Sequence, residues 1–184
     1  CWGWNGYGTL GDGTTINRLT PVNVVSLSSG VRAITVGQFH TCVLLTNGGV
    51  KCWGGNSGGQ LGDGTNTNRL IPVSVNGLDE NVQAIIAGEF HTCALTVNGR
   101  VKCWGRNWSG QLGDSTTTDR LMPVDVNGLD SGVQTITAGE YHTCALVTNG
   151  GIKCWGGNGS GQLGDITTTI PLTPVDVIGL TSGV

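Results

Sequence analysis

The chain has 184 residues, a formal net charge of −3 and only 11% charged residues. This composition excludes a broad basic surface for nucleic acid, which requires clustered Lys and Arg. No apolar run approaches the roughly 18 residues of a membrane-spanning helix, so we expect neither nucleic-acid binding nor membrane insertion. The 33 glycines with so little charge are typical of short strands joined by tight turns, not of a disordered tail.

One stretch, which begins with His-Thr-Cys and ends with Cys-Trp-Gly, occurs three times, at 40–54, 91–105 and 142–156. Each copy contains two cysteines ten residues apart, and successive copies are offset by 51 residues. A fixed period of about 50 residues marks propellers, solenoids and repeat arrays. We therefore divide the chain into units of about 1–51, 52–102 and 103–153, with an incomplete unit at 154–184.

Each unit begins with a Gly-rich loop, at 52–65 in the second unit, because glycine permits positive φ and Asp and Thr favour turns. The alternating stretch 72–75 predicts a strand, and Pro72 at its start indicates an edge or outer position. The apolar segment 82–88 predicts a strand that is buried on both faces, and the hairpin 91–105 adds two more strands. No segment shows a sustained 3.6-residue apolar period, so we expect almost no helix.

Four short strands in each period match the blade of a β-propeller, in which four-stranded sheets repeat around an axis. The predicted fold class is therefore all-β, a β-propeller of four-stranded blades with a 51-residue repeat. About 3.6 such periods are present, so the chain as a whole is predicted to be a partial propeller.

The alternation of side chains along a strand determines whether the two cysteines of a hairpin can lie opposite each other. A two-residue turn at Asn98-Gly99 would place Cys93 opposite Trp104, whereas an odd-numbered loop centred on Asn98 places it opposite Cys103. Opposed residues at a non-hydrogen-bonded site lie about 4.5 Å apart, which suits a disulfide. We predict loops of three or five residues and hairpin-spanning disulfides, the alternative being reduced buried thiols. The predicted pairs are Cys42–Cys52, Cys93–Cys103 and Cys144–Cys154.

The seventh cysteine, Cys1, precedes Trp-Gly as Cys52 does, so we expect its partner upstream, at a residue outside the chain. We accordingly expect the chain to be a segment of a longer array. The ten-residue spacing without Cys-x-x-Cys argues against a zinc or redox set. Disulfides imply an oxidising compartment, so we expect an extracellular or cell-surface location.

A composite motif runs through the unit as Gly-x-x-His-Thr-Cys-Ala-Leu at 88–95 and Gly-x-Val-x-x-Trp-Gly-x-Asn at 99–107. Gly-Gln-Leu-Gly-Asp at 110–114 and Pro-Val-x-Val at 123–126 continue it. These residues resemble the regulator of chromosome condensation repeat, and the resemblance covers the whole chain. It implies a β-propeller, usually of seven blades. The paired cysteines resemble those in bacterial surface and secreted proteins that carry this repeat.

The resemblance leaves several activities open, because the family includes a nucleotide exchange factor, a plant photoreceptor and a secreted inhibitor that acts as a bare binding surface. In the photoreceptor, tryptophans cluster at a dimer face. Here four tryptophans occupy one repeat position and are interpreted as structural; they are Trp2, Trp53, Trp104 and Trp155.

Histidines and aspartates also recur in register. Neighbouring blades pack about 10 Å apart, whereas zinc ligands converge to about 2.1 Å from one ion, so each histidine is expected to make a structural hydrogen bond. The aspartates are expected to stabilise turns and to pair with arginine, since a calcium loop would need more oxygen ligands. We expect no metal, no cofactor and no catalytic residue. The residues are His40, His91 and His142; Asp12, Asp63, Asp114 and Asp165; and Arg18, Arg69 and Arg120.

The units differ most in the Gly-rich loop. Trp4 and Arg106 stand where the other units have glycine, Tyr7 replaces Gly58, and Trp108 replaces Ser57. Aromatic residues and Arg on exposed loops are enriched in binding hot spots. We predict that these residues bind a protein partner on one rim, the alternative being that each loop packs on its own blade. The candidate residues are Trp4, Tyr7, Arg106 and Trp108.

The same loop contains two glycosylation sequons, at Asn107-Trp108-Ser109 and Asn158-Gly159-Ser160. They make Asn107 and Asn158 candidate sites in a cell that glycosylates the protein.

The leading hypothesis is a non-enzymatic extracellular or cell-surface scaffold that binds protein partners through one rim. The alternative is a structural protein whose copies assemble chain to chain into a filament or surface layer, since open ends expose strand edges. Less favoured are an appendage of a larger enzyme and a nucleotide exchange factor.

Overall fold

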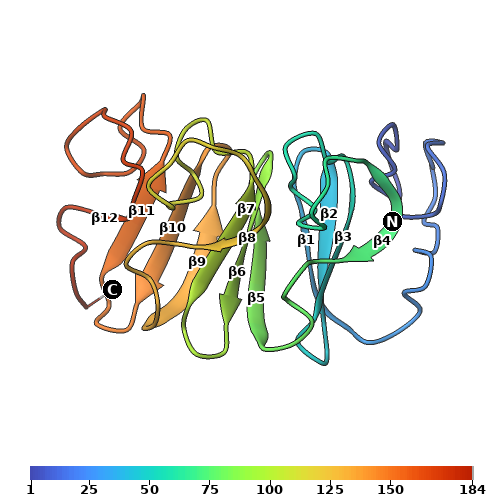
Figure 1. Ribbon diagram of the computed structural model, residues 1–184, viewed down its shortest axis with the longest axis horizontal. Coiled ribbons are helices and arrows are strands. Elements are labelled where there is room, and N and C mark those ends of the chain that lie inside the picture. The colour runs from blue at the N-terminus through green and yellow to red at the C-terminus, as the bar shows by residue number, and fades with distance from the viewer. Residues whose placement is uncertain (184) are drawn as a thin grey trace.

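The computed structural model describes residues 1–183. Its strands form three four-stranded antiparallel sheets, which stand side by side in Figure 1. The first sheet contains β1 (Val31–Val36), β2 (His40–Leu45), β3 (Val50–Gly54) and β4 (Arg69–Ser74). The second contains β5 (Val82–Ala87), β6 (His91–Thr96), β7 (Val101–Gly105) and β8 (Arg120–Asp125). The third contains β9 (Val133–Ala138), β10 (His142–Val147), β11 (Ile152–Gly156) and β12 (Val175–Asp176).

The strands of every sheet are adjacent in the order in which the chain makes them. This is the predicted all-β architecture, with one blade for each 51-residue period. β4 and β8 lie at sheet edges and contain Pro72 and Pro123, which confirms the edge position predicted from proline. Each sheet straddles two of the repeat units defined above, because a period fixes the spacing of blades but not their phase.

Before β1, the segment 1–30 forms one isolated bridge, Gly3 to Arg18, which corresponds to the pair Gly54–Arg69 between β3 and β4. Within residues 1–183 there is no helix long and apolar enough to cross a membrane.

The hairpin register matches the prediction from strand parity. Cys93 lies directly opposite Cys103, and the last ladder pair is Leu95–Val101. Inside the odd-numbered connection, Thr96 N donates a hydrogen bond to Arg100 O over 2.9 Å. Disulfides join Cys42–Cys52, Cys93–Cys103 and Cys144–Cys154, each across 4.1 Å between Cα atoms.

The prediction that 82–88 is buried on both faces is confirmed in part. Val82 and Ile85 are buried, with 1% and 7% of their surface exposed, but Gln83 between them is exposed. Ala84 and Ile86, on the other face, are partly buried against the core cluster between the second and third sheets. Both faces of β5 therefore meet a neighbouring blade, and Gln83 is its one exposed residue.

Tryptophans join consecutive blades. The Trp104 side chain is fully buried, and its Nε1 donates to Gln60 O, in the preceding Gly-rich loop, over 2.9 Å. A Cβ on Gly62, which has φ +69°, would lie 2.7 Å from Trp104 Nε1, so only glycine allows this approach. Trp53 and Trp155 make the same hydrogen bond to Thr9 O and Gln111 O. Trp2, at the same repeat position, is instead 65% exposed.

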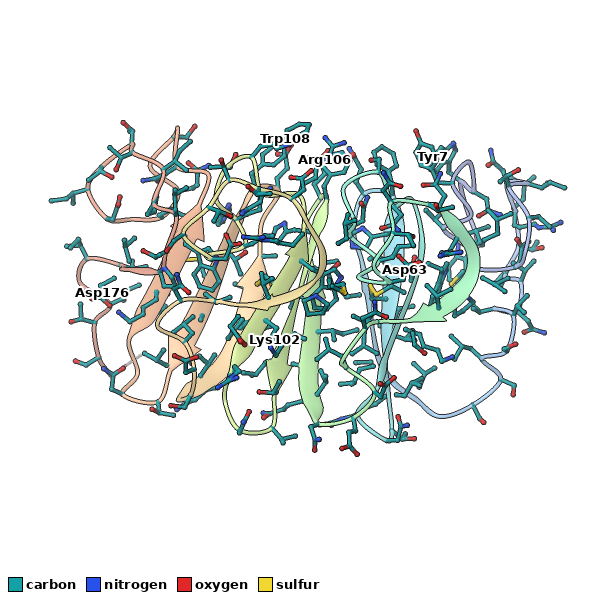
Figure 2. The ribbon with its side chains drawn as sticks, in the orientation of Figure 1. Tyr7, Asp63, Lys102, Arg106, Trp108 and Asp176 are labelled. Carbon is teal, nitrogen blue, oxygen red and sulfur yellow. A yellow bond between two sulfur atoms is a disulfide. The ribbon has the colours of Figure 1, made fainter. Side chains whose placement is uncertain are left out.

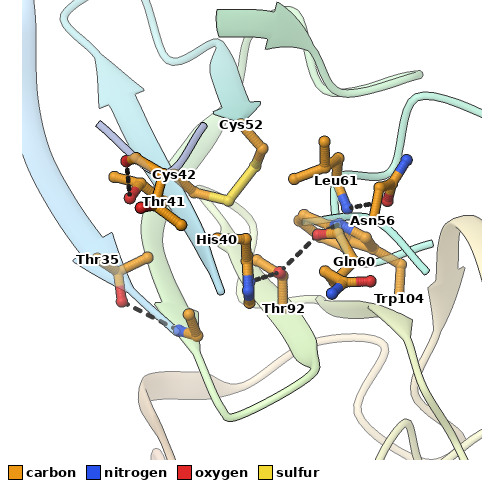
Figure 3. The surroundings of a disulfide bond; sticks show 12 residues. Thr35, His40, Thr41, Cys42, Cys52, Asn56, Gln60, Leu61, Thr92 and Trp104 are labelled. Atoms are coloured by element: carbon orange, nitrogen blue, oxygen red, sulfur yellow. Dashed lines mark hydrogen bonds between the residues drawn. A yellow bond between two sulfur atoms is a disulfide. The ribbon is translucent and has the colours of Figure 1, made fainter. Parts of the chain in front are cut away.

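Histidines make the second joint between blades, which Figure 3 shows beside a disulfide. His40 Nε2 lies 2.9 Å from Thr92 Oγ1, and that hydroxyl donates to Gln60 O over 2.9 Å. Because the hydroxyl proton is used there, Thr92 accepts from a protonated Nε2 of neutral His40. His91 and Thr143 repeat the arrangement, which confirms the predicted structural role for these two histidines.

Candidate functional site

One buried amide organises each Gly-rich loop. Asn56 is fully buried, and its Nδ2 donates to Thr65 O and Thr67 O, over 3.0 and 3.1 Å, and to Asp63 Oδ1. Its Oδ1 accepts from Leu61 N over 2.9 Å. The hydrogen bonds of Asn56 therefore hold the loop backbone at several points, and this fixes the positions from which its outward side chains extend.

The recurrent aspartate fixes the same loop. Asp63 Oδ1 accepts from Thr65 N and Thr65 Oγ1, and Asp63 Oδ2 accepts from Arg69 Nε. Partial burial works to raise the pKa of Asp63, but the hydrogen bonds from Thr65 and Arg69 outweigh it and hold the pKa below its usual value. The predicted turn and arginine pairing are confirmed here, at Asp12–Arg18 and at Asp114–Arg120.

Both candidate glycosylation sites occupy the central amide position of their loops. Asn107 and Asn158 are fully buried. Asn107 Nδ2 donates to Asp114 Oδ1 and Thr116 O over 3.0 and 2.9 Å, and Asn158 Nδ2 donates to Asp165 Oδ1 over 3.0 Å. A glycan is attached at this nitrogen, so the structure argues against glycosylation of the folded chain at either sequon.

The four predicted binding residues belong to one continuous row on a single rim. Figure 2 shows Tyr7, Arg106 and Trp108 along the same edge of the molecule. Ring centroids are 5.3 Å apart for Trp4–Tyr7, 5.2 Å for Tyr7–Phe39 and 5.7 Å for Phe39–Phe90. Arg106 then lies between Phe90 and Trp108. We call this set the rim row; its members are Trp4, Tyr7, Phe39, Phe90, Arg106 and Trp108.

Sequence reasoning missed Phe39 and Phe90, which connect the two ends of the rim row. Both precede the histidine that begins the hairpin, as Tyr141 does in the next copy. An aromatic residue at this position in every copy was the available signal.

Arg106 reaches across to the preceding loop. The carbon at the centre of its guanidinium lies 4.0 Å from the Trp108 ring centroid and 4.9 Å from that of Phe90. Its Nη2 donates to Ser57 Oγ over 3.3 Å. A Cβ on Gly58 would lie 2.3 Å from Arg106 Cγ, so glycine at 58 makes room for this crossing.

A pocket of about 260 Å³ opens in the middle of the rim row. Tyr7, Phe39 and Phe90 supply its aromatic surfaces, and Arg106 borders it. We call it the rim pocket; it is lined by Tyr7, Phe39, Gly55, Asn56, Ser57, Gln60, Asn68, Phe90 and Arg106.

The rim row is only partly covered by its own loops. Trp4 lies over Gly6 of its own loop, as the alternative prediction required, but it remains 50% exposed. Tyr7 and Trp108 are 42% and 66% exposed. The row therefore presents a partly exposed aromatic surface that includes one cation, Arg106, between Phe90 and Trp108.

Beside the rim row, Tyr141 stands close to two carboxylates. The hydrogen bond to Glu89, with burial and Glu140, raises the pKa of Tyr141 to about 12. Burial raises the pKa of Glu89 as well, and the neighbouring Glu140 adds to the shift. Glu89 and Glu140 border a second pocket of about 330 Å³, formed where β1, β5 and β9 end.

Comparison with protein families gives matches along most of the chain. The family model described as the Regulator of chromosome condensation (RCC1) repeat matches residues 1–44, 47–95 and 98–146. A second model of the same repeat matches residues 31–60, 82–111 and 133–162.

Curated relatives share about a third of the residues. The chain is 35% identical over 184 residues to the probable E3 ubiquitin-protein ligase HERC4 of Homo sapiens, covering 97% of this chain and 17% of that protein. It is 34% identical over 166 residues to the Ultraviolet-B receptor UVR8 of Arabidopsis thaliana, covering 89% of this chain and 38% of that protein. The chain thus spans less than half the length of these relatives.

Solved structures show the same fold. Human WBSCR16 superposes with a TM-score of 0.84 at 24% identity, covering 96% of this chain and 47% of that one. Yeast RCC1 (Prp20), in a crystal structure with Kap60 bound, superposes with a TM-score of 0.80 at 21% identity, covering 96% and 43%.

Proposed function

Because the chain belongs to the regulator of chromosome condensation (RCC1) repeat family, we propose that it is a non-enzymatic propeller scaffold that binds protein partners through the rim row. The observation that carries this proposal is the continuity of the row. Side chains from several repeats join into one partly exposed surface of aromatic rings and a guanidinium. Such residues dominate the binding energy of protein interfaces.

Three further features support the proposal. The Gly-rich loops are held by internal hydrogen bonds, so little conformational entropy would be lost when a partner binds. The recurrent aspartates and histidines make hydrogen bonds within the loops and between the blades, which leaves them poorly placed for catalysis. Yeast RCC1 (Prp20), which has the same fold, has been crystallised with a protein, Kap60.

Alanine substitution tests the rim row. The variant Trp4→Ala/Tyr7→Ala/Arg106→Ala/Trp108→Ala is compared with Val97→Ala for capture of proteins from the source organism. Val97 is a matched control because it is 63% exposed and lies on the β6–β7 turn, at the end of the strands away from the rim row. We expect the fourfold variant to lose the captured proteins and Val97→Ala to keep them. Equal capture by both variants would show that the rim row does not bind these proteins.

We place the scaffold outside the cell or at its surface. The three disulfides support this placement, because such pairs persist in oxidising compartments. The mass of the natural protein before and after reduction is the test. A gain of six hydrogens is expected for three bridges, whereas an unchanged mass would favour a reducing compartment.

A second candidate function is assembly of copies end to end. Val31, Ile34 and Val36 on β1 are 42%, 57% and 64% exposed, whereas Val82 and Ile85 on β5 are buried by the preceding blade. The last sheet offers an apolar pocket between Ile136, Leu146 and Ile152. Sedimentation over a range of concentrations tests this idea. Growth in size with concentration supports assembly, and a constant monomer rejects it.

A further inference from the structure

We propose that the rim pocket receives an acidic side chain, Asp or Glu, that stands beside an apolar residue in a partner segment. The carboxylate would pair with Arg106, and the apolar neighbour would lie against the rings of Tyr7, Phe39 and Phe90. This inference rests on the proposed function and deepens it, because it specifies the chemistry of the partner.

The first observation is a cation without a counter-ion. Within residues 1–183 the ion pairs involve other arginines and lysines, and none includes Arg106. Its Nε is buried and has no hydrogen-bond partner among those residues. Guanidinium stays charged at any physiological pH and forms its strongest contacts with carboxylates. The rings of Phe90 and Trp108 and the hydrogen bond to Ser57 hold the guanidinium at the border of the rim pocket.

The second observation is that the amides at the rim pocket have their oxygens occupied. Gln60 Oε1 accepts from Gly58 N over 2.9 Å, and Asn68 Oδ1 accepts from Asn56 N over 2.9 Å. These hydrogen bonds fix the orientation of both amides. The amide nitrogens of Gln60 and Asn68 are therefore the groups available to a ligand. With Arg106 they make a set of donors, which suits a carboxylate.

A side-chain carboxylate fits better than the carboxylate at a chain terminus. Terminal carboxylates are captured by several free backbone N–H groups in a row. Here Gly58 N, Gly59 N and Leu61 N already donate to Gln60 Oε1, Asn56 O and Asn56 Oδ1. The aromatic wall adds a place for an apolar neighbour, as an internal partner segment would supply.

The rim pocket exists because Gly55 lacks a side chain. At the equivalent repeat position Trp4 and Arg106 stand in the flanking loops, and Gly157 follows in the last. A Cβ on Gly55 would lie 3.1 Å from Phe39 Cβ, and one on Gly157 would lie 3.2 Å from Tyr141 Cβ. The two glycines thus tolerate a side chain about equally. Gly55→Trp fills the pocket, and Gly157→Trp is its matched control.

The test uses short peptides capped at both ends, in which Glu or Asp precedes or follows Phe, Trp or Leu. Binding to the isotopically labelled 184-residue chain is followed by NMR. We expect acidic peptides to shift the resonances of Ser57, Phe90 and Arg106. The same peptides with Gln or Asn should bind at least about tenfold more weakly, since one charge-assisted contact is lost. Binding should also fade below about pH 4, where the carboxylate gains a proton.

The variants assign the binding to the rim pocket. Arg106→Gln and Gly55→Trp should each weaken the acidic peptides at least about tenfold, while Gly157→Trp leaves them unchanged. Retained dispersion of the NMR spectrum confirms that each variant is folded. A Gln peptide with a free terminal carboxylate distinguishes the source of the charge, and tighter binding of that peptide would overturn the choice of a side chain.

Equal binding of acidic and amide peptides, or no shift at the rim pocket with any peptide of the set, would overturn the inference. The proposed function is judged separately. Loss of captured proteins in the fourfold alanine variant, together with failure of all acidic peptides, would keep the scaffold proposal and reject only the carboxylate pocket.

Discussion

Asn56 connects both ends of its amide to the second Gly-rich loop, and the same residue recurs at 5, 107 and 158. Nothing in the local sequence marks this asparagine as buried, since Asn among glycines is typical of an exposed turn. Its burial is evident only from the folded loop, which surrounds it. For the same reason, the sequons at Asn107 and Asn158 did not reveal that these asparagines are buried, because a motif of three residues carries no information on burial.

Replacing this amide should weaken the fold. We expect Asn56→Ala to lower the free energy of unfolding by about 2 to 4 kcal/mol, because Leu61 N and two carbonyls lose a buried partner. Urea unfolding measures the change. Asn66→Ala, an exposed position in the same loop, is the control and should change stability by less than about 0.5 kcal/mol. Equal effects of the two substitutions would contradict the central role of Asn56.

The buried histidines should make stability depend on pH. Burial lowers the pKa of His40 to about 4, and burial together with the neighbouring histidines lowers the pKa of His91 to about 3. Between these values and 6.5 the unfolded chain binds protons that the folded chain does not. The contribution of these histidines to the free energy of unfolding is therefore fully present above pH 6.5 and is lost as the pH falls towards 4. For His40 this loss is on the order of 3 kcal/mol.

Thermal unfolding at several pH values measures this loss. His91→Gln retains a neutral donor near Thr143 Oγ1 but does not titrate, so its stability should vary less between pH 4 and 6.5. The aspartates act in a lower window, because the pKa of Asp12 is about 2. An equally steep dependence in His91→Gln would contradict the assignment to histidine.

At the scale of the element, the strand pairing of the hairpins was the feature most fully predictable from sequence. Side chains alternate along a strand, so the ten-residue spacing of Cys93 and Cys103 allowed only odd-numbered loops if the two were to meet. The observed pairing follows this rule. The exposure of Gln83 within β5 could not be derived in the same way, because an apolar run does not reveal which of its side chains the neighbouring blades leave uncovered.

Each disulfide should contribute to stability through the unfolded chain. Cys93→Ala/Cys103→Ala removes a short covalent loop, and we expect a loss of about 2 to 4 kcal/mol in the free energy of unfolding. Guanidinium unfolding of the variant and of the parent chain measures it. Cys1→Ser is the control, since Cys1 forms no disulfide within residues 1–183. Unchanged stability of the double variant would show that the bridge adds nothing to the fold.

At the scale of the whole molecule, the 51-residue period was the basis for predicting the fold. It identified blades, because one period holds the four strands that a blade needs. It also placed Trp4, Tyr7, Arg106 and Trp108 on one rim, since equivalent loops of successive blades lie side by side. Their connection through Phe39 and Phe90 depends on how far neighbouring blades rotate, which no period specifies.

The most direct test of the account is hydrogen exchange on the chain with a captured protein partner bound. We expect slower exchange in the loops around 4–8, 55–60 and 106–110, which carry the rim row and the rim pocket. The β-hairpin turns around 97–100 and the outer strands β4 and β8 should exchange as they do in the free chain. Protection confined to those turns or outer strands, with the rim loops unchanged, would contradict the account.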